Sequence, residues 1–270
     1  DVHGSRGLGD VYKRQDYDFE EADEILNESF TSFELGYGFR SSNFKGTLNA
    51  YHTVWGDRTL RRSTSIDDQG VRIIYSGVEQ THQGIEAEMT WYPSSRLRVK
   101  GMASLGNWKY TKNFEGNAYY IDNNQSAGTT GTLYLDGVKI GDAAQTTMYL
   151  GATYKLSDRL SADLDFQTFA NLHGRFSPLD SEFFTANNRG SIELPSFSLV
   201  DIGATYQTTF LGYETIVRLN VNNLFDEEYL SQSQTNIHDD GGRTWNGVNV
   251  ENLVYFGKGT TWNLGATFRF

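Results

Sequence analysis

The feature that most constrains this chain is the strict two-residue period of its last nine residues, 262–270. The even-numbered positions carry only Trp, Leu, Ala and Phe, and the odd-numbered positions carry only Asn, Gly, Thr and Arg. Successive side chains of a β-strand point to opposite faces, so this segment predicts a strand with one apolar and one polar face. The apolar set ends on a bare aromatic residue, which suits a strand that meets lipid on one face better than a strand of a soluble sandwich.

The same period recurs along most of the chain. It predicts nine strands, at about 30–40, 44–61, 71–92, 97–112, 143–156, 160–171, 197–208, 213–230 and 253–270. Their links alternate between short turns and long polar loops, the long ones at 62–70, 113–142, 172–195 and 231–252. This pattern predicts an all-β antiparallel meander that forms part of a large transmembrane β-barrel, with the long loops on the extracellular side. Because nine is odd, we expect at least one further strand upstream.

Composition narrows the class further. The 270 residues contain no Cys, which excludes disulfides and thiolate metal sites, and the formal net charge of −11 argues against nucleic-acid binding. No apolar run is long enough for a transmembrane helix. Residues 1–15 show no strand or helix period and no signal-peptide core, so we interpret them as a non-native or disordered leader, and 16–270 as the barrel section.

No catalytic constellation emerges, and we predict that the protein is not an enzyme. Glu86 with Glu88, and Asp163 with Asp165, are adjacent on one strand face, as glycosidase carboxylates can be, but hydration of a barrel lumen explains them better. The sequence Gly-x-Ser-x-Gly of a nucleophile elbow is absent. No cofactor and no metal site is predicted, and His238, which precedes two Asp residues, is interpreted as part of a solvated acidic loop.

Residues near the loop ends are the candidate substrate-binding set. Arginines there can attract an anionic ligand, and aromatic and amide side chains can close over it, although surface exposure explains the arginines equally well. The candidates are Arg58, Arg61, Arg62, Tyr119, Tyr120, Tyr134, Trp245 and Asn246. Trp55 and Trp108 lie near the same ends, and we assign them to an interfacial aromatic girdle rather than to the ligand site.

Residues 220–229 read NVNNLFDEEY, which resembles the penultimate-strand motif of TonB-dependent outer-membrane receptors. The terminal strand resembles that family's last strand, and similar stretches occur upstream, such as HQGIEAEMTW at 82–91 and LPSFSLVDIG at 194–203. The resemblance covers residues 27–270. The family-motif residues, which the resemblance implies are structural, are Asn222, Asn223, Leu224, Phe225, Asp226 and Phe270.

The resemblance implies a barrel of about 22 strands, closed around an N-terminal plug that this chain lacks. It implies an active transporter in the outer membrane of a Gram-negative bacterium, which takes up a scarce nutrient such as an iron–siderophore, cobalamin or a glycan. The implied partners are the TonB complex, reached through the plug region, outer-membrane lipid, the barrel-assembly machinery and a small-molecule or glycan substrate. The alternative is a secreted all-β carbohydrate- or ligand-binding module without transport.

Overall fold

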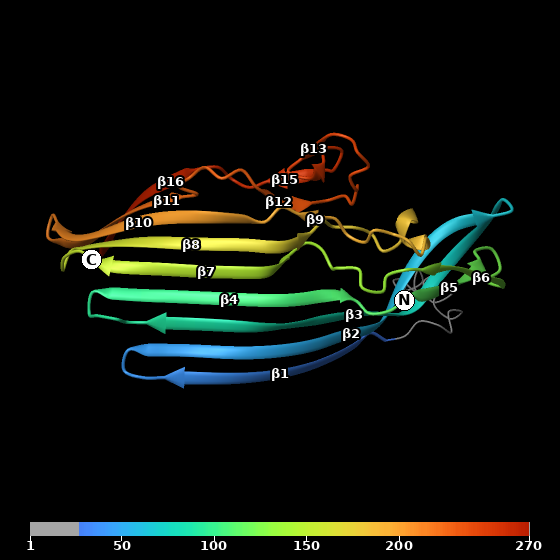
Figure 1. Ribbon diagram of the computed structural model, residues 1–270, viewed down its shortest axis with the longest axis horizontal. Coiled ribbons are helices and arrows are strands. Elements are labelled where there is room, and N and C mark those ends of the chain that lie inside the picture. Colours follow the sequence, from blue (N-terminus) through green and yellow to red (C-terminus); the bar gives the residue numbers. More distant parts are fainter. Residues whose placement is uncertain (1–26, 270) are drawn as a thin grey trace, which may run out of the picture.

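The computed structural model describes residues 27–269, which are mostly antiparallel strands (Figure 1). One path of hydrogen-bonded neighbours crosses the main sheet. It consists of β1 (Ser29–Arg40), β2 (Phe44–Ile66), β3 (Gln69–Trp91), β4 (Leu97–Tyr110), β7 (Ala144–Lys155), β8 (Leu160–His173), β10 (Phe197–Phe210), β11 (Tyr213–Asn222) and β16 (Thr261–Arg269). The nine-strand meander is therefore confirmed. The leader predicted for residues 1–15, and Phe270, lie outside the described residues.

The connections separate the sheet into two ends, as the sequence predicted. Short turns at 41–43, 92–96, 156–159 and 211–212 gather at one end, which we call the turn end. The long connections gather at the other, which we call the loop end (Figure 1). This arrangement brings the long loops close to one another in space, although they are far apart in the sequence.

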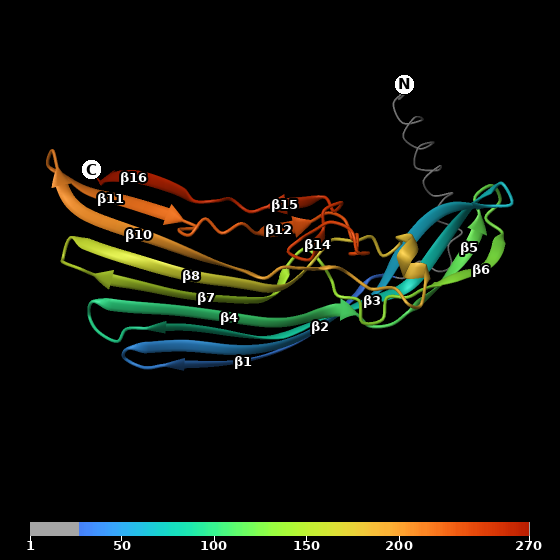
Figure 2. The same ribbon diagram turned by 45° about the horizontal axis from the view of Figure 1, so that its top comes forward.

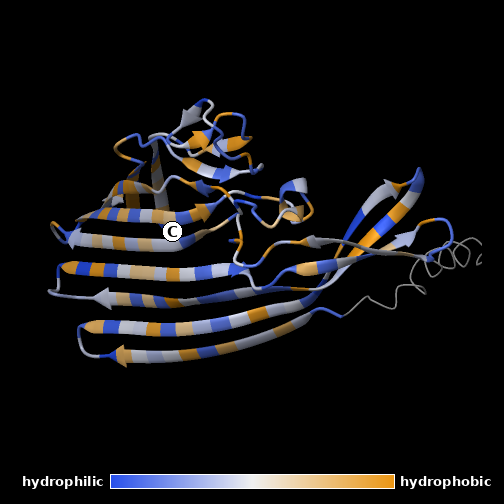
Figure 3. Cartoon of the chain, turned by 45° about the vertical axis from the view of Figure 1, so that its right-hand side comes forward, coloured by the Kyte–Doolittle hydropathy of each residue, from blue (hydrophilic) through white to orange (hydrophobic). Residues whose placement is uncertain are grey.

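Hydrophobic and hydrophilic residues alternate along the long strands of the main sheet (Figure 3), so each of these strands has one mostly apolar and one mostly polar face. The registry aligns the apolar side chains across strands, because Leu35 pairs with Ala50, Ala50 with Ile85, and Ile85 with Leu105. The apolar side chains are largely uncovered: Leu35 is 78% exposed and Leu264 is 63% exposed. Such a continuous exposed apolar face is not stable against water and requires another apolar phase or partner.

The main sheet is open. Within residues 27–269, β1 pairs only with β2, and β16 pairs only with β11, so the two end strands do not meet. The sheet curves instead of closing (Figure 2). Each end strand consequently leaves one row of backbone N–H and C=O groups without a strand partner among the described residues.

The remaining elements lie at the loop end. They are β5 (Phe114–Tyr120), β6 (Ser126–Leu133), η1 (Ser181–Phe184), β9 (Glu193–Leu194), β12 (Leu230–Ser233), β13 (Thr244–Trp245), β14 (Val248–Asn249) and β15 (Val254–Phe256). Between residues 27 and 269, no helix has the length and apolarity needed to cross a membrane.

Two loop predictions are wrong in detail. The polar loop expected at 62–70 is instead a continuation of β2 and β3 to a tight turn, where Asp67 and Asp68 both adopt positive φ. The loop expected to be irregular at 113–142 contains the β5–β6 hairpin, which pairs with β3. The reason is tertiary: Val71, Ile73 and Tyr75 on β3 are buried against this hairpin.

β11 also ends at Asn222 rather than near residue 230. The backbone reverses at Asn223, where φ is 49°, a left-handed conformation that Asn tolerates better than most residues. The alternation in the sequence does not reveal this reversal, because Leu224 and Tyr229 continue to look like strand residues.

Buried apolar side chains are concentrated at the loop end, where they include the loop-end parts of β3, β4 and β8, and not in the part of the main sheet near the turn end. A first cluster, the distal cluster, joins β3, β4, β5, β6 and η1, and includes Tyr75, Leu133 and Phe183. A second, the proximal cluster, joins β8, β9, β12 and β14 around Leu172, Leu194 and Leu230. The rest of the sheet therefore has no core of its own.

We expect residues 27–269 alone to form no stable closed structure in detergent. The open edges and the exposed apolar face leave backbone groups and apolar surface without partners. Purified and refolded from urea into detergent micelles, this segment should be polydisperse and should migrate identically in gels with and without boiling. A monodisperse segment with heat-modifiable migration would contradict the open sheet.

Candidate functional site

The polar face is a cross-strand network of hydrogen bonds near the turn end. Arg218 on β11 donates two hydrogen bonds of 2.9 Å to the carboxylate of Asp163 on β8, and a third of 2.8 Å to Thr205 on β10. Asn220 and Asn263 continue the network to β16 at 2.8 Å. Such a hydrated wall suits the lining of an aqueous passage.

The candidate carboxylate pairs do not act as acid and base together. Asp163 is bound by Arg218, whereas Asp165 accepts a hydrogen bond of 2.5 Å from the hydroxyl of Tyr149. Glu86 accepts only a long hydrogen bond of 3.4 Å from Ser104, and Glu88 is exposed. The carboxylates therefore have separate environments, which agrees with the interpretation that they hydrate the polar face.

The long loops form one interlocked structure. Asn236, in the connection between β12 and β13, accepts a hydrogen bond of 2.7 Å from the backbone N–H of Ile192 and donates one of 2.9 Å to the carbonyl of Gly190. Its amide nitrogen also contacts the carboxylate of Glu182 in η1 at 2.5 Å. One amide thus joins the loops 172–195 and 231–252.

The loop 113–142 belongs to the same assembly. The carbonyl of Tyr134 accepts a hydrogen bond of 2.9 Å from the side chain of Asn188, and Gln232 donates one of 3.0 Å to Asp142. Gln145, at the start of β7, is 1% exposed and binds the backbone of Trp108 through both of its amide atoms, at 2.9 and 3.0 Å. Sequence reasoning missed Asn236 and Gln145, because a single amide in a polar segment carries no periodic signal.

Two of the three candidate arginines are held by aromatic side chains. The guanidinium of Arg58 lies 3.9 Å from the ring centre of Trp55, and that of Arg62 lies 4.9 Å from the ring centre of Phe184. Burial raises the pKa of Tyr75 above its ordinary value, and the nearby Arg62 guanidinium partly offsets this rise. Arg61 is exposed. Arg58 and Arg62 are half-buried, so Arg61 is the most solvent-accessible of the three candidate arginines.

The candidate aromatic residues divide between the two clusters. Tyr119 and Tyr120 lie on β5, and Tyr120 packs against the distal cluster. Tyr134 is half-buried, and its backbone N–H donates to the carbonyl of Phe183 at 2.7 Å. Trp245 packs against the proximal cluster, with its ring 5.2 Å from that of Phe256.

Asn246 is exposed at the turn between β13 and β14, where its φ is 45°. It lies beside Trp245 in the sequence, but Trp245 packs inward whereas Asn246 does not. The structure therefore brings the candidates to the loop end, but in two groups and with different degrees of exposure.

The assignment of Trp55 and Trp108 to an interfacial girdle is wrong. Trp55 and Trp108 both occupy strand positions whose side chains belong to the polar face. The indole nitrogen of Trp108 donates a hydrogen bond of 2.9 Å to the hydroxyl of Tyr51. The ring of His82 lies 5.6 Å from that of Trp108. The aromatic pair Phe39 and Phe44, 6.1 Å apart, instead occupies the turn end. The position of each Trp near the end of a strand suggested a girdle, but the alternation of side chains decides on which face it lies.

The NNLFD segment ties three strands together. The buried side chain of Asn223 donates to the carbonyls of Glu227 and Lys258, at 2.9 and 3.1 Å, and accepts from the N–H of Glu227 at 2.8 Å. Its backbone N–H donates to Asp201 on β10 at 2.7 Å. Asp226 accepts from the N–H of Thr260, just before β16, at 2.8 Å. These contacts fix the start of the last strand.

His238 does not form a metal site with the acidic residues beside it. Its Nε2 atom lies 2.9 Å from the carbonyl of Gly190, and Asp240 pairs with Arg189 at 2.7 Å. No group of three or more His, Asp or Glu side chains among residues 27–269 is arranged to hold a metal ion.

Asn223→Gly should lower the free energy of unfolding of the whole receptor by about 2 kcal/mol, because several hydrogen bonds of a buried amide are lost. Glycine keeps the left-handed backbone, and its greater freedom in the unfolded chain affects the control below equally. The matched control is Asn246→Gly, at an exposed residue with similar φ, which should change stability by less than about 0.5 kcal/mol. Urea unfolding in detergent measures both. Equal effects of the two substitutions would show that the Asn223 side chain is not structural.

Comparison with known proteins agrees with these features. A family model described as "TonB dependent receptor-like, beta-barrel" matches residues 18–224. No match was found among curated proteins. Among solved structures, the copper transporter OprC aligns with a TM-score of 0.55 and 14% identity over 92% of this chain and 33% of its own.

Two iron receptors align in the same way. BauA, the ferric preacinetobactin receptor from Acinetobacter baumannii, has a TM-score of 0.57 and 19% identity over 88% of this chain and 29% of its own. The ferric yersiniabactin uptake receptor FyuA from Yersinia pestis has a TM-score of 0.55 and 13% identity over 90% of this chain and 30% of its own. The chain therefore spans about a third of the length of these structures, and at such identities they show the fold alone.

The family match covers more than half of the chain, and the antiparallel meander with its two unlike faces fits it. The apolar face accordingly suits contact with lipid, and the polar face suits the lining of a lumen. The chain belongs to the TonB-dependent receptors of the Gram-negative outer membrane, as a section of their β-barrel.

Proposed function

We propose that the whole receptor, of which this chain forms a section, imports a scarce nutrient across the outer membrane with energy supplied through TonB. An iron–siderophore or another metal chelate is the favoured substrate class, and cobalamin or a glycan is the alternative within the same function. The family match and the transporters and receptors among its structural relatives support this proposal. An enzymatic role has no such support.

The observation that carries the proposal is the polar face of the sheet. Near the turn end, Arg218 bonds to Asp163 and Asn220 bonds to Asn263 across neighbouring strands, so this face presents polar groups to a passage. Such a wall offers a water-filled route for a polar solute, and a binding module without transport has no need of it. The secreted ligand-binding module therefore remains only as the rival interpretation.

Substrate recognition is assigned to the loop end. The interlocked loops are a rigid surface, and binding residues concentrate on loops that a scaffold holds in place. The exposed candidates, Arg61 and Asn246, are the first to meet a ligand in this proposal, and Tyr119 and Tyr134 are partly accessible at the same end of the sheet. Arg58, Arg62, Tyr120 and Trp245 position the surface through their ring contacts.

The partners follow from the same proposal. The TonB complex would be reached through a plug region that is not among the described residues. Outer-membrane lipid would cover the apolar face, and the barrel-assembly machinery would insert the strands. Nucleic acid is not a proposed partner, because the chain has a net charge of −11.

Uptake by a strain that lacks its own receptors tests the proposal. The whole receptor should restore uptake of one labelled member of a panel of ferric chelates, cobalamin and oligosaccharides, and only in cells with functional TonB. The three loops 113–142, 172–195 and 231–252, exchanged together into a receptor of known substrate, should transfer that preference at least partly, because specificity is a difference of contact energies.

The hydrogen bonds between the loops provide a control for this exchange experiment. Exchange of the loop 231–252 alone breaks the contacts of Asn236 with Glu182 and Gly190, so it should lower surface abundance without transferring preference. Uptake that is equal with and without TonB, or binding without any uptake, would contradict the proposed function. Uptake that follows the recipient's substrate after the triple exchange would place recognition outside these loops.

A further inference from the structure

The apolar face of the main sheet carries a groove that crosses six neighbouring strands, from β1 to β8. The groove has a volume of about 580 Å³. Its ends are formed by Phe39 on β1 and Phe166 on β8, and its floor by Gly46, Ala87, Gly101 and Ala103 on β2 to β4. We call it the transverse groove.

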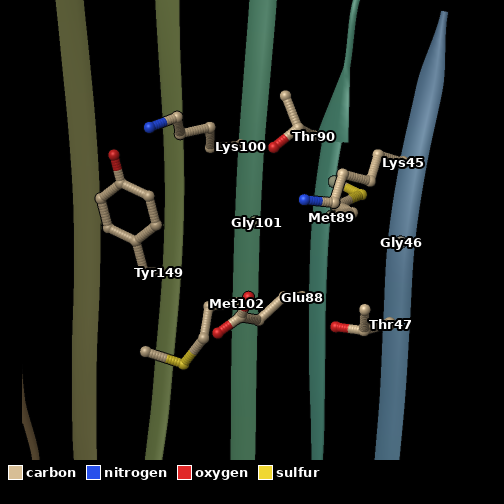
Figure 4. A pocket seen from close by; sticks show the side chains of 10 residues that line it. All are labelled: Lys45, Gly46, Thr47, Glu88, Met89, Thr90, Lys100, Gly101, Met102 and Tyr149. Carbon is tan, nitrogen blue, oxygen red and sulfur yellow. The ribbon is translucent and has the colours of Figure 1, made fainter. Parts of the chain in front are cut away.

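Two glycines deepen the floor of the transverse groove. Gly46 pairs with Met89, and Met89 pairs with Gly101, so the three residues lie at one level on β2, β3 and β4 (Figure 4). A Cβ atom at position 46 would lie 2.8 Å from the ring of Phe44, and one at position 101 would lie 2.9 Å from the terminal methyl group of Met89. The Phe44 and Met89 side chains therefore lie over the glycines and do not stand out from the sheet.

Larger side chains border this floor along the strands. Ala87 pairs with Ala103 in the row next to the glycines, and both are half-buried. In the row beyond them, towards the loop end, Ile85 pairs with Leu105, and these side chains are 52% and 50% exposed. Trp91 stands at the turn end and is 42% exposed. The small residues thus form a depression between two ridges.

The dimensions of the transverse groove restrict its occupant. Its floor is two rows of side chains wide, and rows on one face of a sheet are about 7 Å apart. An α-helix with its side chains is about 10–12 Å in diameter, which is too wide for this floor. The five intervals between six strands span about 24 Å, because neighbouring strands are about 4.8 Å apart. An unbranched fatty acyl chain is narrow and long enough to lie in such a space.

The position of the transverse groove indicates which leaflet supplies this chain. Phe39 is one residue from the end of β1, and Phe44 is the first residue of β2, so the groove lies beside the short turns. The charged residues between its floor residues, such as Lys45, Glu88 and Lys100, lie on the polar face (Figure 4). In an outer-membrane barrel, the short turns face the periplasm. The leaflet on that side of the outer membrane consists of phospholipids.

We propose that the transverse groove binds one acyl chain of a phospholipid from the leaflet at the turn end. The proposal rests on the proposed function, in which lipid covers the apolar face, and deepens it by assigning one retained chain to defined residues. A chain in a groove is in contact with the floor and both ridges, so it buries more apolar surface than a chain on a flat face. β2, β3 and β4 are paired on both sides, so further strands at the open edges would leave the groove unchanged.

A phosphatidylglycerol with a diazirine in the middle of one acyl chain tests the site without any substitution. The whole receptor is placed in phospholipid vesicles that contain a trace of this lipid, illuminated and digested. Cross-links should be about tenfold more frequent on peptides of β2 to β4 than on those of β10 and β11, since about two more methylene groups are buried in the groove. β10 and β11 belong to the same face but lie outside the groove.

Filling the transverse groove gives the second measurement. Ala87→Leu with Ala103→Leu places two larger side chains on its floor, and should lower the amount of phospholipid retained by the whole receptor in mild detergent about tenfold. Native mass spectrometry measures this retention. The matched control is Ala162→Leu with Ala204→Leu, a registry pair on the same face outside the groove, which should leave retention unchanged. Heat-modifiable migration in gels shows that both variants are folded.

Each outcome decides the proposal. Cross-links spread evenly over the apolar face, or equal retention by the filled and control variants, would overturn the bound chain and leave the proposed function standing. Retention of lipid A in place of phospholipid, or cross-links between two copies of the receptor, would also overturn it, because the occupant would be a different one. A receptor that retains the chain in the groove but shows no uptake would contradict the proposed function alone.

Discussion

The structure depends on one constraint: a backbone that crosses hydrocarbon must have its hydrogen bonds satisfied by other strands. Nine antiparallel strands satisfy this requirement for one another everywhere except at the outer edges of β1 and β16. The two-residue period follows from the same constraint, because a sheet between lipid and water must carry apolar side chains on one face and polar ones on the other. Within residues 27–269, these two edges stay open.

The part of the main sheet near the turn end has no buried apolar core, and the buried apolar clusters lie at the loop end. The distal and proximal clusters bury side chains such as Tyr75, Phe183 and Leu230 there, and amides such as Asn236 join the loops. The loops are therefore part of the folded structure rather than flexible additions to it. For a receptor, such a surface limits the entropy lost when a ligand binds.

Sequence reasoning succeeded where the physics is local and failed where it is tertiary. The two-residue period predicted the nine strands, because a strand between lipid and water needs alternating apolar and polar residues along its whole length. It did not predict the β5–β6 hairpin, since SAGTTGTL in β6 has no alternation and its partner β5 is in turn paired with the distant β3. The arginines at the loop end were predicted from their type and place, but Gln145 and Asn236 were missed because their partners are distant or unremarkable in sequence.

Alternate residues of the last strand, β16, should face lipid and water. Spin labels placed singly at Leu264, Ala266, Asn263 and Thr267 of the whole receptor in bilayers measure this most directly, by their accessibility to oxygen and to a soluble nickel chelate. The registry places Leu264 beside Leu219 and Ala266 beside Val217 on the apolar face. Oxygen should therefore reach Leu264 and Ala266, and the chelate should reach Asn263 and Thr267. The reverse order, or equal accessibility at all four positions, would contradict the account.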